Sequence, residues 1–104
     1  MKHTQIVISI IAAFISMSTV AAEPVPAVNG RCPIYYNKHK GYCEPRPHAA
    51  DAIVRQGSGC PLGWHKSGGH CTRGGSSLSR HAIERTGSSC PRGYSKDRGY
   101  CVKR

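Results

Sequence analysis

The sequence predicts a small disulfide-rich fold, mainly β and irregular, in which three tandem disulfide-closed β-hairpins are joined by linkers that hold short helical turns. Two observations support this prediction. Six cysteines fall into three equally spaced pairs, and the 104 residues include only one tryptophan, five tyrosines and one phenylalanine. Because a short chain with so few large apolar side chains cannot bury a sizeable core, cross-links must carry much of its stability.

The first 22 residues have the layout of a secretory signal peptide. Lys2 and His3 precede a mostly apolar stretch at residues 6–20, and small residues lead up to Ala22. We expect cleavage after Ala22 rather than an uncleaved membrane anchor, because this stretch is shorter than the roughly 20 residues that span a bilayer. The mature chain, residues 23–104, is therefore predicted to be secreted or periplasmic, where thiols are oxidised.

Each cysteine pair bounds one copy of a repeat. Segments 32–43, 60–71 and 90–101 read CPIYYNKHKGYC, CPLGWHKSGGHC and CPRGYSKDRGYC, and they share the pattern CPxxΩxKxxGxC, in which Ω is aromatic. Six cysteines permit many connectivities. The repeat favours pairing within each segment, so the predicted disulfides are Cys32–Cys43, Cys60–Cys71 and Cys90–Cys101.

Each repeat is expected to fold as a β-hairpin with a stapled base. The loop centres fall at residues 38–41, 66–69 and 96–99, where glycine permits the positive φ that tight turns require. An isolated hairpin is marginal in water, whereas closing a loop of about 12 residues removes on the order of 3 kcal/mol of unfolded-state entropy. The disulfide is therefore expected to decide whether each hairpin forms.

The pattern CPxGW or CPxGY, with a second cysteine after ten intervening residues, resembles the N-terminal disulfide hairpin of long-form C-type lectin-like domains. The second repeat matches it best, through Cys60-Pro61, Gly63-Trp64, Gly69 and Cys71. The first repeat departs from it, because Tyr35 stands where the pattern has glycine. The resemblance covers about 12 residues per repeat and implies a hairpin, not lectin activity, since no acidic and amide cluster like that family's calcium and sugar ligands follows.

The predicted boundaries follow the cysteines. They are an extended, mobile tail at 23–31, hairpins at 32–43 and 60–71, linkers at 44–59 and 72–89, and a third hairpin with a basic C-terminus at 90–104. Residues 52–59 align with 82–89, which makes the repeat 30 residues long and the first copy truncated. Short helices are expected between Pro47 and Gly57 and between Ser79 and Gly87. The hairpins are expected to form beads on a string or a loosely stacked row.

Positive charge is the second strong feature of the composition. The mature chain has fourteen Lys and Arg residues against five Asp and Glu residues, a net charge of +9. Such a chain is attracted to polyanions by counterion release and electrostatic steering. The predicted partner is a polyanionic envelope or matrix component, such as lipopolysaccharide, an acidic glycan or extracellular DNA, or else an unidentified protein. The alternative is that the charge only keeps a protein with a small core soluble.

Basic and aromatic side chains alternate inside the hairpins, a pattern that suits stacking on bases or sugars while pairing with phosphates. The candidate ligand-binding residues are Lys38, Lys40, Tyr42, Lys66, Lys96, Arg98 and Tyr100. A purely structural role is also consistent with the pattern. In particular, the aromatic residue that follows each Cys-Pro pair is expected to cover its disulfide, which concerns Tyr36, Trp64 and Tyr94.

Catalysis, cofactors and metals are not expected. The acids are isolated, the cysteines are assigned to disulfides, and the chain has neither CxxC nor HxxxH spacing. We expect a cationic repeat protein that binds polyanionic envelope or extracellular components. The alternatives are a secreted cationic effector, antimicrobial or toxin-like, and an inhibitor that binds another protein. A membrane-disrupting effector would need a contiguous apolar face beside its basic one, and the sequence shows little of it.

Overall fold

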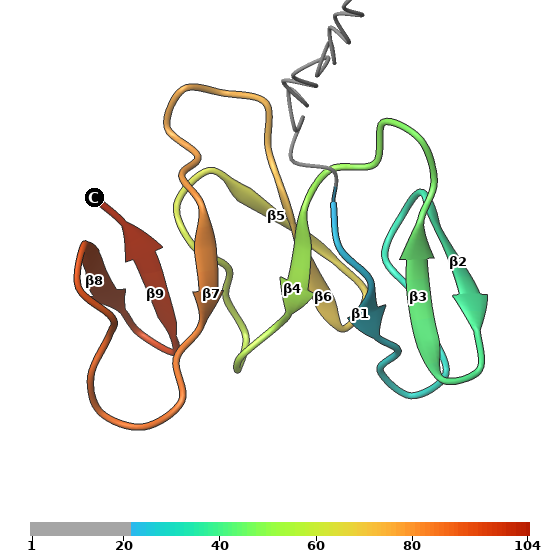
Figure 1. The fold of residues 1–104 in the computed structure, drawn as a ribbon, viewed down its shortest axis with the longest axis horizontal. Coiled ribbons are helices and arrows are strands. Elements are labelled where there is room, and N and C mark those ends of the chain that lie inside the picture. The colour runs from blue at the N-terminus through green and yellow to red at the C-terminus, as the bar shows by residue number, and fades with distance from the viewer. Residues whose placement is uncertain (1–21) are drawn as a thin grey trace, which may run out of the picture.

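The computed structural model describes residues 22–104, so all of the predicted signal peptide except Ala22 lies outside the described residues. The described chain forms nine strands and no helix, arranged as three three-stranded antiparallel sheets that follow one another in a row (Figure 1). The strands are β1 (Val25–Pro26), β2 (Tyr36–His39), β3 (Tyr42–Pro45), β4 (Ala52–Val54), β5 (Trp64–Ser67), β6 (His70–Arg73), β7 (Ala82–Glu84), β8 (Tyr94–Asp97) and β9 (Tyr100–Lys103).

The predicted disulfide-closed hairpins are confirmed. Cys32–Cys43, Cys60–Cys71 and Cys90–Cys101 are all bonded. The three hairpins pair their two strands in the same register. In each one, the lysine of the repeat pattern lies opposite the second cysteine, as Lys38 lies opposite Cys43. The turns contain only two residues, Lys40-Gly41 in the first hairpin. Lys38, Lys66 and Lys96, expected at the loop centres, therefore lie within strands.

The expected linker helices are wrong. Residues 52–54 and 82–84 are strands β4 and β7, which pair with β6 and β9 of the hairpin that follows them. Ile53, Val54 and Ile83 are β-branched and fit a pleated, half-buried surface better than a short, unsupported helix. Each hairpin offers the edge of its central strand, so a preceding segment of three residues can satisfy its backbone hydrogen bonds there.

The first repeat is not truncated. In the segment expected to be a mobile tail, Val25–Pro26 forms β1 and pairs with β3, and Val25 lies opposite Cys43 as Ile53 lies opposite Cys71. Val25 precedes Cys32 by the same number of residues as Ile53 precedes Cys60. A proline at this position is tolerated because β1 is an edge strand. The chain thus has three complete units, unit 1 (24–46), unit 2 (52–74) and unit 3 (82–104), with spacers at 47–51 and 75–81.

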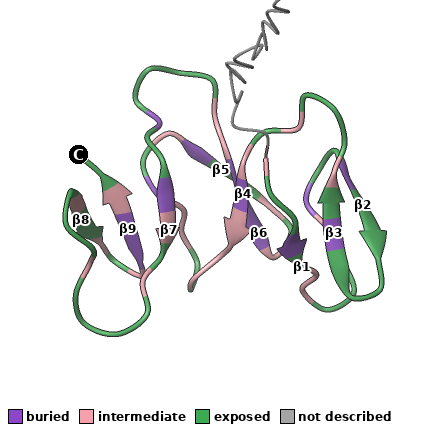
Figure 2. Ribbon diagram, viewed as in Figure 1, coloured by how far each residue is buried: buried purple, intermediate pink, exposed green. Residues whose placement is uncertain are grey.

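The small core lies at the two junctions between units (Figure 2). Ala52, the first residue of β4, packs with Tyr36 and Cys43 of unit 1. Ala82, the first residue of β7, packs with Trp64 and Cys71 of unit 2, and Tyr100 completes that cluster. Strands β1, β4 and β7 also contact one another in turn. The units therefore form a docked row rather than beads on a string.

Candidate functional site

Each unit contacts the next through the aromatic residue at the start of its hairpin. The Tyr36 hydroxyl donates to the carbonyl oxygen of Ala50 at 2.7 Å, and Trp64 Nε1 donates to that of Arg80 at 2.9 Å. Both acceptors lie two residues before the first strand of the following unit, and both aromatic side chains are buried. Tyr94 has the same place in unit 3, and none of the described units docks beside it. It is half-buried, and its hydroxyl is joined to His81 Nδ1 at 2.8 Å.

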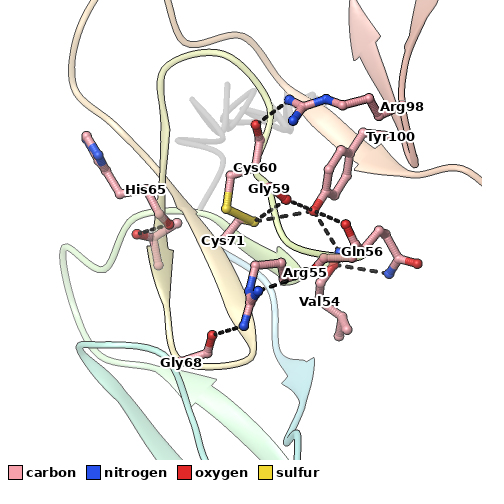
Figure 3. The surroundings of a disulfide bond; sticks show 12 residues. Val54, Arg55, Gln56, Gly59, Cys60, His65, Gly68, Cys71, Arg98 and Tyr100 are labelled. Atoms are coloured by element: carbon pink, nitrogen blue, oxygen red, sulfur yellow. Dashed lines mark hydrogen bonds between the residues drawn. A yellow bond between two sulfur atoms is a disulfide. The ribbon is translucent and has the colours of Figure 1, made fainter.

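Each unit contacts the preceding one through the first residue of its central strand. In unit 3 this residue is Tyr100, whose side chain is 1% exposed. Its hydroxyl accepts a hydrogen bond from the Gln56 N–H at 2.7 Å and donates to the carbonyl oxygen of Gly59 at 2.6 Å. It also lies 3.5 Å from Cys71 Sγ, so that it contacts the disulfide of unit 2 (Figure 3). The prediction that Tyr100 contacts a ligand is therefore not met, because unit 2 already surrounds the ring.

His70 has the place of Tyr100 in unit 2. It is fully buried, and its Nε2 lies 2.7 Å from the carbonyl oxygen of Pro26 in unit 1. Because a carbonyl oxygen only accepts, Nε2 carries the hydrogen. The equivalent residue of unit 1, Tyr42, contacts none of the other described units and is 53% exposed. Position in the row, rather than residue type, therefore decides which of these side chains face solvent.

The basic residues predicted to bind a ligand are exposed but do not form one cluster. Lys38, Lys66 and Lys96 lie one on each sheet at the same register position. Two of the predicted cations also bond to the protein itself. Lys38 Nζ donates to the carbonyl oxygen of Gly30 at 3.1 Å, and Arg98 Nη2 donates to that of Cys60 at 2.7 Å. Arg98 therefore also contributes to the contact between units 2 and 3 (Figure 3).

Cationic side chains converge instead where unit 3 meets unit 2. A cavity of about 270 Å³ is lined there by five residues, which we call the cationic pocket: Arg73, Arg80, His81, Lys103 and Arg104. Arg73 comes from β6, Lys103 from β9, and Arg80 and His81 from the end of the spacer that leads into β7. The docking of unit 3 on unit 2 is thus what assembles the pocket.

The protein holds these side chains through their neighbours. Arg73 Nη2 donates to the carbonyl oxygen of Ser79 at 3.2 Å, which ties β6 to the second spacer. The Lys103 N–H donates to the carbonyl oxygen of His81 at 2.8 Å, and Arg104 Nε donates to Ser95 Oγ at 3.0 Å. These contacts use the backbone and neutral groups, so the charges of Arg80, Lys103 and Arg104 are not paired with a carboxylate, whereas Arg73 also lies 3.7 Å from Asp51.

The cationic pocket has no counterpart at the other junction. Where the second junction has Arg73, Arg80 and His81, the first has Pro45, Ala50 and Asp51. Asp51, in the spacer of the first junction, forms an ion pair at 3.7 Å with Arg73, one of the cations of the pocket. The second junction therefore concentrates charge that the first one lacks.

Comparison with known proteins does not place the chain in a family. No family model, no curated protein and no solved structure matches it.

A larger cavity, of about 570 Å³, lies between the loop of unit 1 and the turn of unit 2. It is lined by Val28, Asn29, Arg31, Arg55, Gly57, Gly68 and Gly69. One of its two cations, Arg55, donates to the carbonyl oxygens of Gly57 and Gly68, both at 3.0 Å. Since two Arg side chains line this cavity and four Lys or Arg side chains line the smaller cationic pocket, we regard the cationic pocket as the better anion site.

Within residues 22–104, no three His, Cys, Asp or Glu side chains gather as a metal site would require. In the same residues, no helix has the length and apolar character needed to cross a membrane.

The residues of the cationic pocket were not among those predicted from the sequence. Arg73 and Lys103 occupy the same position, two residues after the second cysteine of their units, and that shared position was a usable signal. The cysteine-bounded pattern ends before it. Arg80 and His81 are in a spacer, and nothing in their local sequence indicates that β9 will lie beside them.

Proposed function

We propose that this chain is a secreted or periplasmic cationic repeat protein that binds a polyanionic envelope or extracellular component, with the cationic pocket as its main anion site. The observation that carries the proposal is the convergence of Arg73, Arg80, Lys103 and Arg104 on one cavity. Guanidinium and ammonium groups are the side chains that bind phosphate, sulfate and carboxylate most strongly. Folding therefore places several such groups where one anionic segment of a polymer can reach them.

The distribution of ion pairs supports this reading. Among residues 22–104, two ion pairs link a Lys or Arg side chain to a carboxylate, Arg73 with Asp51 and Arg98 with Asp97. Most of the fourteen cations thus have no acidic partner of their own. A row of units with unpaired charge also presents several contacts to a repetitive polymer, which raises affinity through effective concentration.

The test is binding of the purified, oxidised protein to lipopolysaccharide, a carboxylated polysaccharide, DNA and anionic vesicles, at low and at physiological salt. Two double variants with the same loss of charge are compared, Lys103→Gln with Arg104→Gln in the pocket, and Lys38→Gln with Lys40→Gln on the first hairpin. We expect wild-type binding to at least one polymer to survive physiological salt. The pocket variant should bind it roughly tenfold or more weakly than the hairpin variant, because charge-assisted hydrogen bonds are lost.

Equal weakening in the two double variants would show that the charge acts diffusely and that the pocket is not the site. Binding that vanishes for every target at physiological salt would contradict the proposal as a whole. Leakage of the vesicles at binding concentrations would favour the cationic effector instead. The fluorescence of Trp64, which is buried at the junction, reports whether each variant keeps unit 3 docked.

A further inference from the structure

The two junctions between units use equivalent contacts. At each one, the glycine of a hairpin turn packs so closely on the preceding unit that a side chain would not fit. A Cβ on Gly69 would lie 2.6 Å from Val28 Cγ1, and a Cβ on Gly99 would lie 2.7 Å from Gln56 Cβ. The next residue, His70 or Tyr100, then reaches the backbone of that preceding unit. We call this glycine and aromatic pair the head of a unit, and the segment that follows the first strand its receiving loop.

Within residues 22–104, the head of unit 1 docks on no other unit. A Cβ on Gly41 would meet no atom within 4 Å, whereas the equivalent Gly69 and Gly99 have no such space. Tyr42 is 53% exposed, whereas the equivalent Tyr100 is 1% exposed. The turn between β2 and β3 stands at the end of the row away from unit 3 (Figure 1). The same glycine and aromatic pair is therefore present there without a docked unit, and Gly41 has a φ of +81° whereas Gly69 and Gly99 have no positive φ.

At the other end of the row, the receiving loop of unit 3 has no unit docked on it in the part of the chain that the structure describes. Its Thr86 and Ser89 are equivalent to Gln56 and Gly59, which bind the hydroxyl of Tyr100, and both are exposed. Among the described residues, no backbone hydrogen bond engages the N–H of Thr86 or the carbonyl oxygen of Ser89. The donor and acceptor that a tyrosine hydroxyl would use are thus both free.

The type of loop also matches the type of head. In unit 1, Val28 and Arg31 bond to each other through both backbone hydrogen bonds, at 3.0 and 2.9 Å. Because the backbone groups of Val28 and Arg31 already bond to each other, the docked His70 bonds to the carbonyl oxygen of Pro26. In unit 2 the loop is open between Gln56 and Gly59, and it receives a tyrosine. The free loop of unit 3 is of the open kind, and the free head of unit 1 carries a tyrosine.

We propose that the protein associates head to tail with further copies of itself. Tyr42 of one copy docks on the loop at residues 85–89 of another, accepting from the Thr86 N–H and donating to the Ser89 carbonyl oxygen, while Gly41 packs against Thr86. This interface is heterologous, so copies add head to tail into an open chain or a closed ring rather than pairing as a two-fold dimer. The contact between two copies would thus repeat the junction that joins unit 1 to unit 2 and unit 2 to unit 3 within one chain.

Charge sets the conditions for this assembly. Each mature copy carries a net charge of +9, so copies repel one another at low ionic strength and repel less once salt screens them. Association is therefore expected to strengthen between low salt and about 0.5 M salt, opposite to the behaviour of polyanion binding.

The test is sedimentation of the oxidised protein without any polyanion, over a range of concentrations up to the millimolar region and in low and high salt. We expect the mean mass of the wild type to rise with concentration, and more so in high salt. Tyr42→Ala should weaken association roughly tenfold or more, as truncation of an anchoring aromatic does at interfaces. Gly41→Asn should weaken it similarly, because Asn tolerates the φ of +81° but brings a Cβ into the docking surface.

The matched control is Tyr35→Gly. It removes another tyrosine of unit 1 that is equally open to solvent, at 59% exposed, and it keeps the positive φ of that position. We expect this variant to associate like the wild type. A wild type that stays monomeric throughout would overturn the proposal, and so would a Tyr42→Ala variant that associates unchanged or a Tyr35→Gly variant that loses as much. Since no polyanion is present, none of these outcomes bears on the proposed anion site.

A second measurement locates the contact. A photoreactive benzoylphenylalanine at position 86 should cross-link to residues 40–42 of another copy. Cross-links elsewhere on the partner copy would contradict the proposed geometry even if the protein associates.

Discussion

At the scale of single residues, burial at the junctions decides what each aromatic side chain can do. Tyr36 illustrates this, because it is 7% exposed and its hydroxyl donates to the carbonyl oxygen of Ala50. Burial raises the pKa of Tyr36 from 10.0 to about 12, and the negative charge of Asp51 adds to the effect. The neutral phenol is therefore part of the packed state of the first junction.

This shift predicts a loss of stability in strong base. In the unfolded chain the phenol ionises near its usual pKa of about 10, whereas in the folded chain it stays neutral up to about 12. The contribution of Tyr36 to stability is thus fully present below pH 10 and is lost as the pH rises towards 12. Urea unfolding measured after brief exposure to each pH should show this decline, and Tyr36→Phe should remove its tyrosine-dependent part. If the stability of Tyr36→Phe declines with pH as much as that of the wild type, the decline comes from groups other than Tyr36.

At the scale of elements, the second spacer packs against the loop of unit 2. Ser79 is buried, and its hydroxyl donates to the carbonyl oxygen of Gly74 at 2.7 Å. A Cβ on Gly63 would lie only 2.7 Å from the backbone N and Cα of Ser79. Close approach at Gly63 therefore fixes the spacer that carries Arg80 and His81 into the cationic pocket.

Gly63 and Gly93 form a matched pair for testing this packing. They are equivalent residues with φ of +82° and +89°, but a Cβ on Gly93 would meet nothing within 4 Å. Replacing either by alanine forces a left-handed alanine, at a cost of about 1–3 kcal/mol. We expect Gly63→Ala to lower the free energy of unfolding by about 1 kcal/mol or more beyond the loss in Gly93→Ala, because the spacer backbone must move. Urea unfolding of the two variants gives the difference, and equal losses would show that the spacer is not packed as described.

The elements also show what the sequence could and could not predict. Cysteine spacing was enough to predict the three hairpins and their disulfides, since both partners lie in one short segment. The third strands β1, β4 and β7 were not predicted, because their partners lie further along the chain and a run such as Ala52-Ile53-Val54 suits a helix or a strand. Pro24 and Pro26 further concealed β1, although the distance from Val25 to Cys32 matched the other units.

At the scale of the whole molecule, docking of one unit on the next produces features that no single unit contains. The cationic pocket draws on unit 2, unit 3 and the spacer between them. The repeat pattern within each hairpin therefore indicates only scattered lysines. The burial of Tyr100 and the exposure of Tyr42, at the same position of the repeat, likewise depend on the row. The proposed anion site and the proposed self-association both rest on this docking.

The most direct test of the docked row is hydrogen exchange at three backbone amides. The Gln56 N–H donates to the hydroxyl of Tyr100 in unit 3, whereas the Arg55 N–H donates to Gly69 within unit 2. Thr86 is equivalent to Gln56, but none of the units described in residues 22–104 docks on it. In dilute protein, where copies stay apart, we predict slow exchange at Gln56 and Arg55 and fast exchange at Thr86. Tyr100→Phe should speed exchange at Gln56 by roughly tenfold and leave Arg55 slow. If Gln56 in the wild type exchanges as fast as Thr86, the units are not docked, and the account of the pocket and of self-association is contradicted.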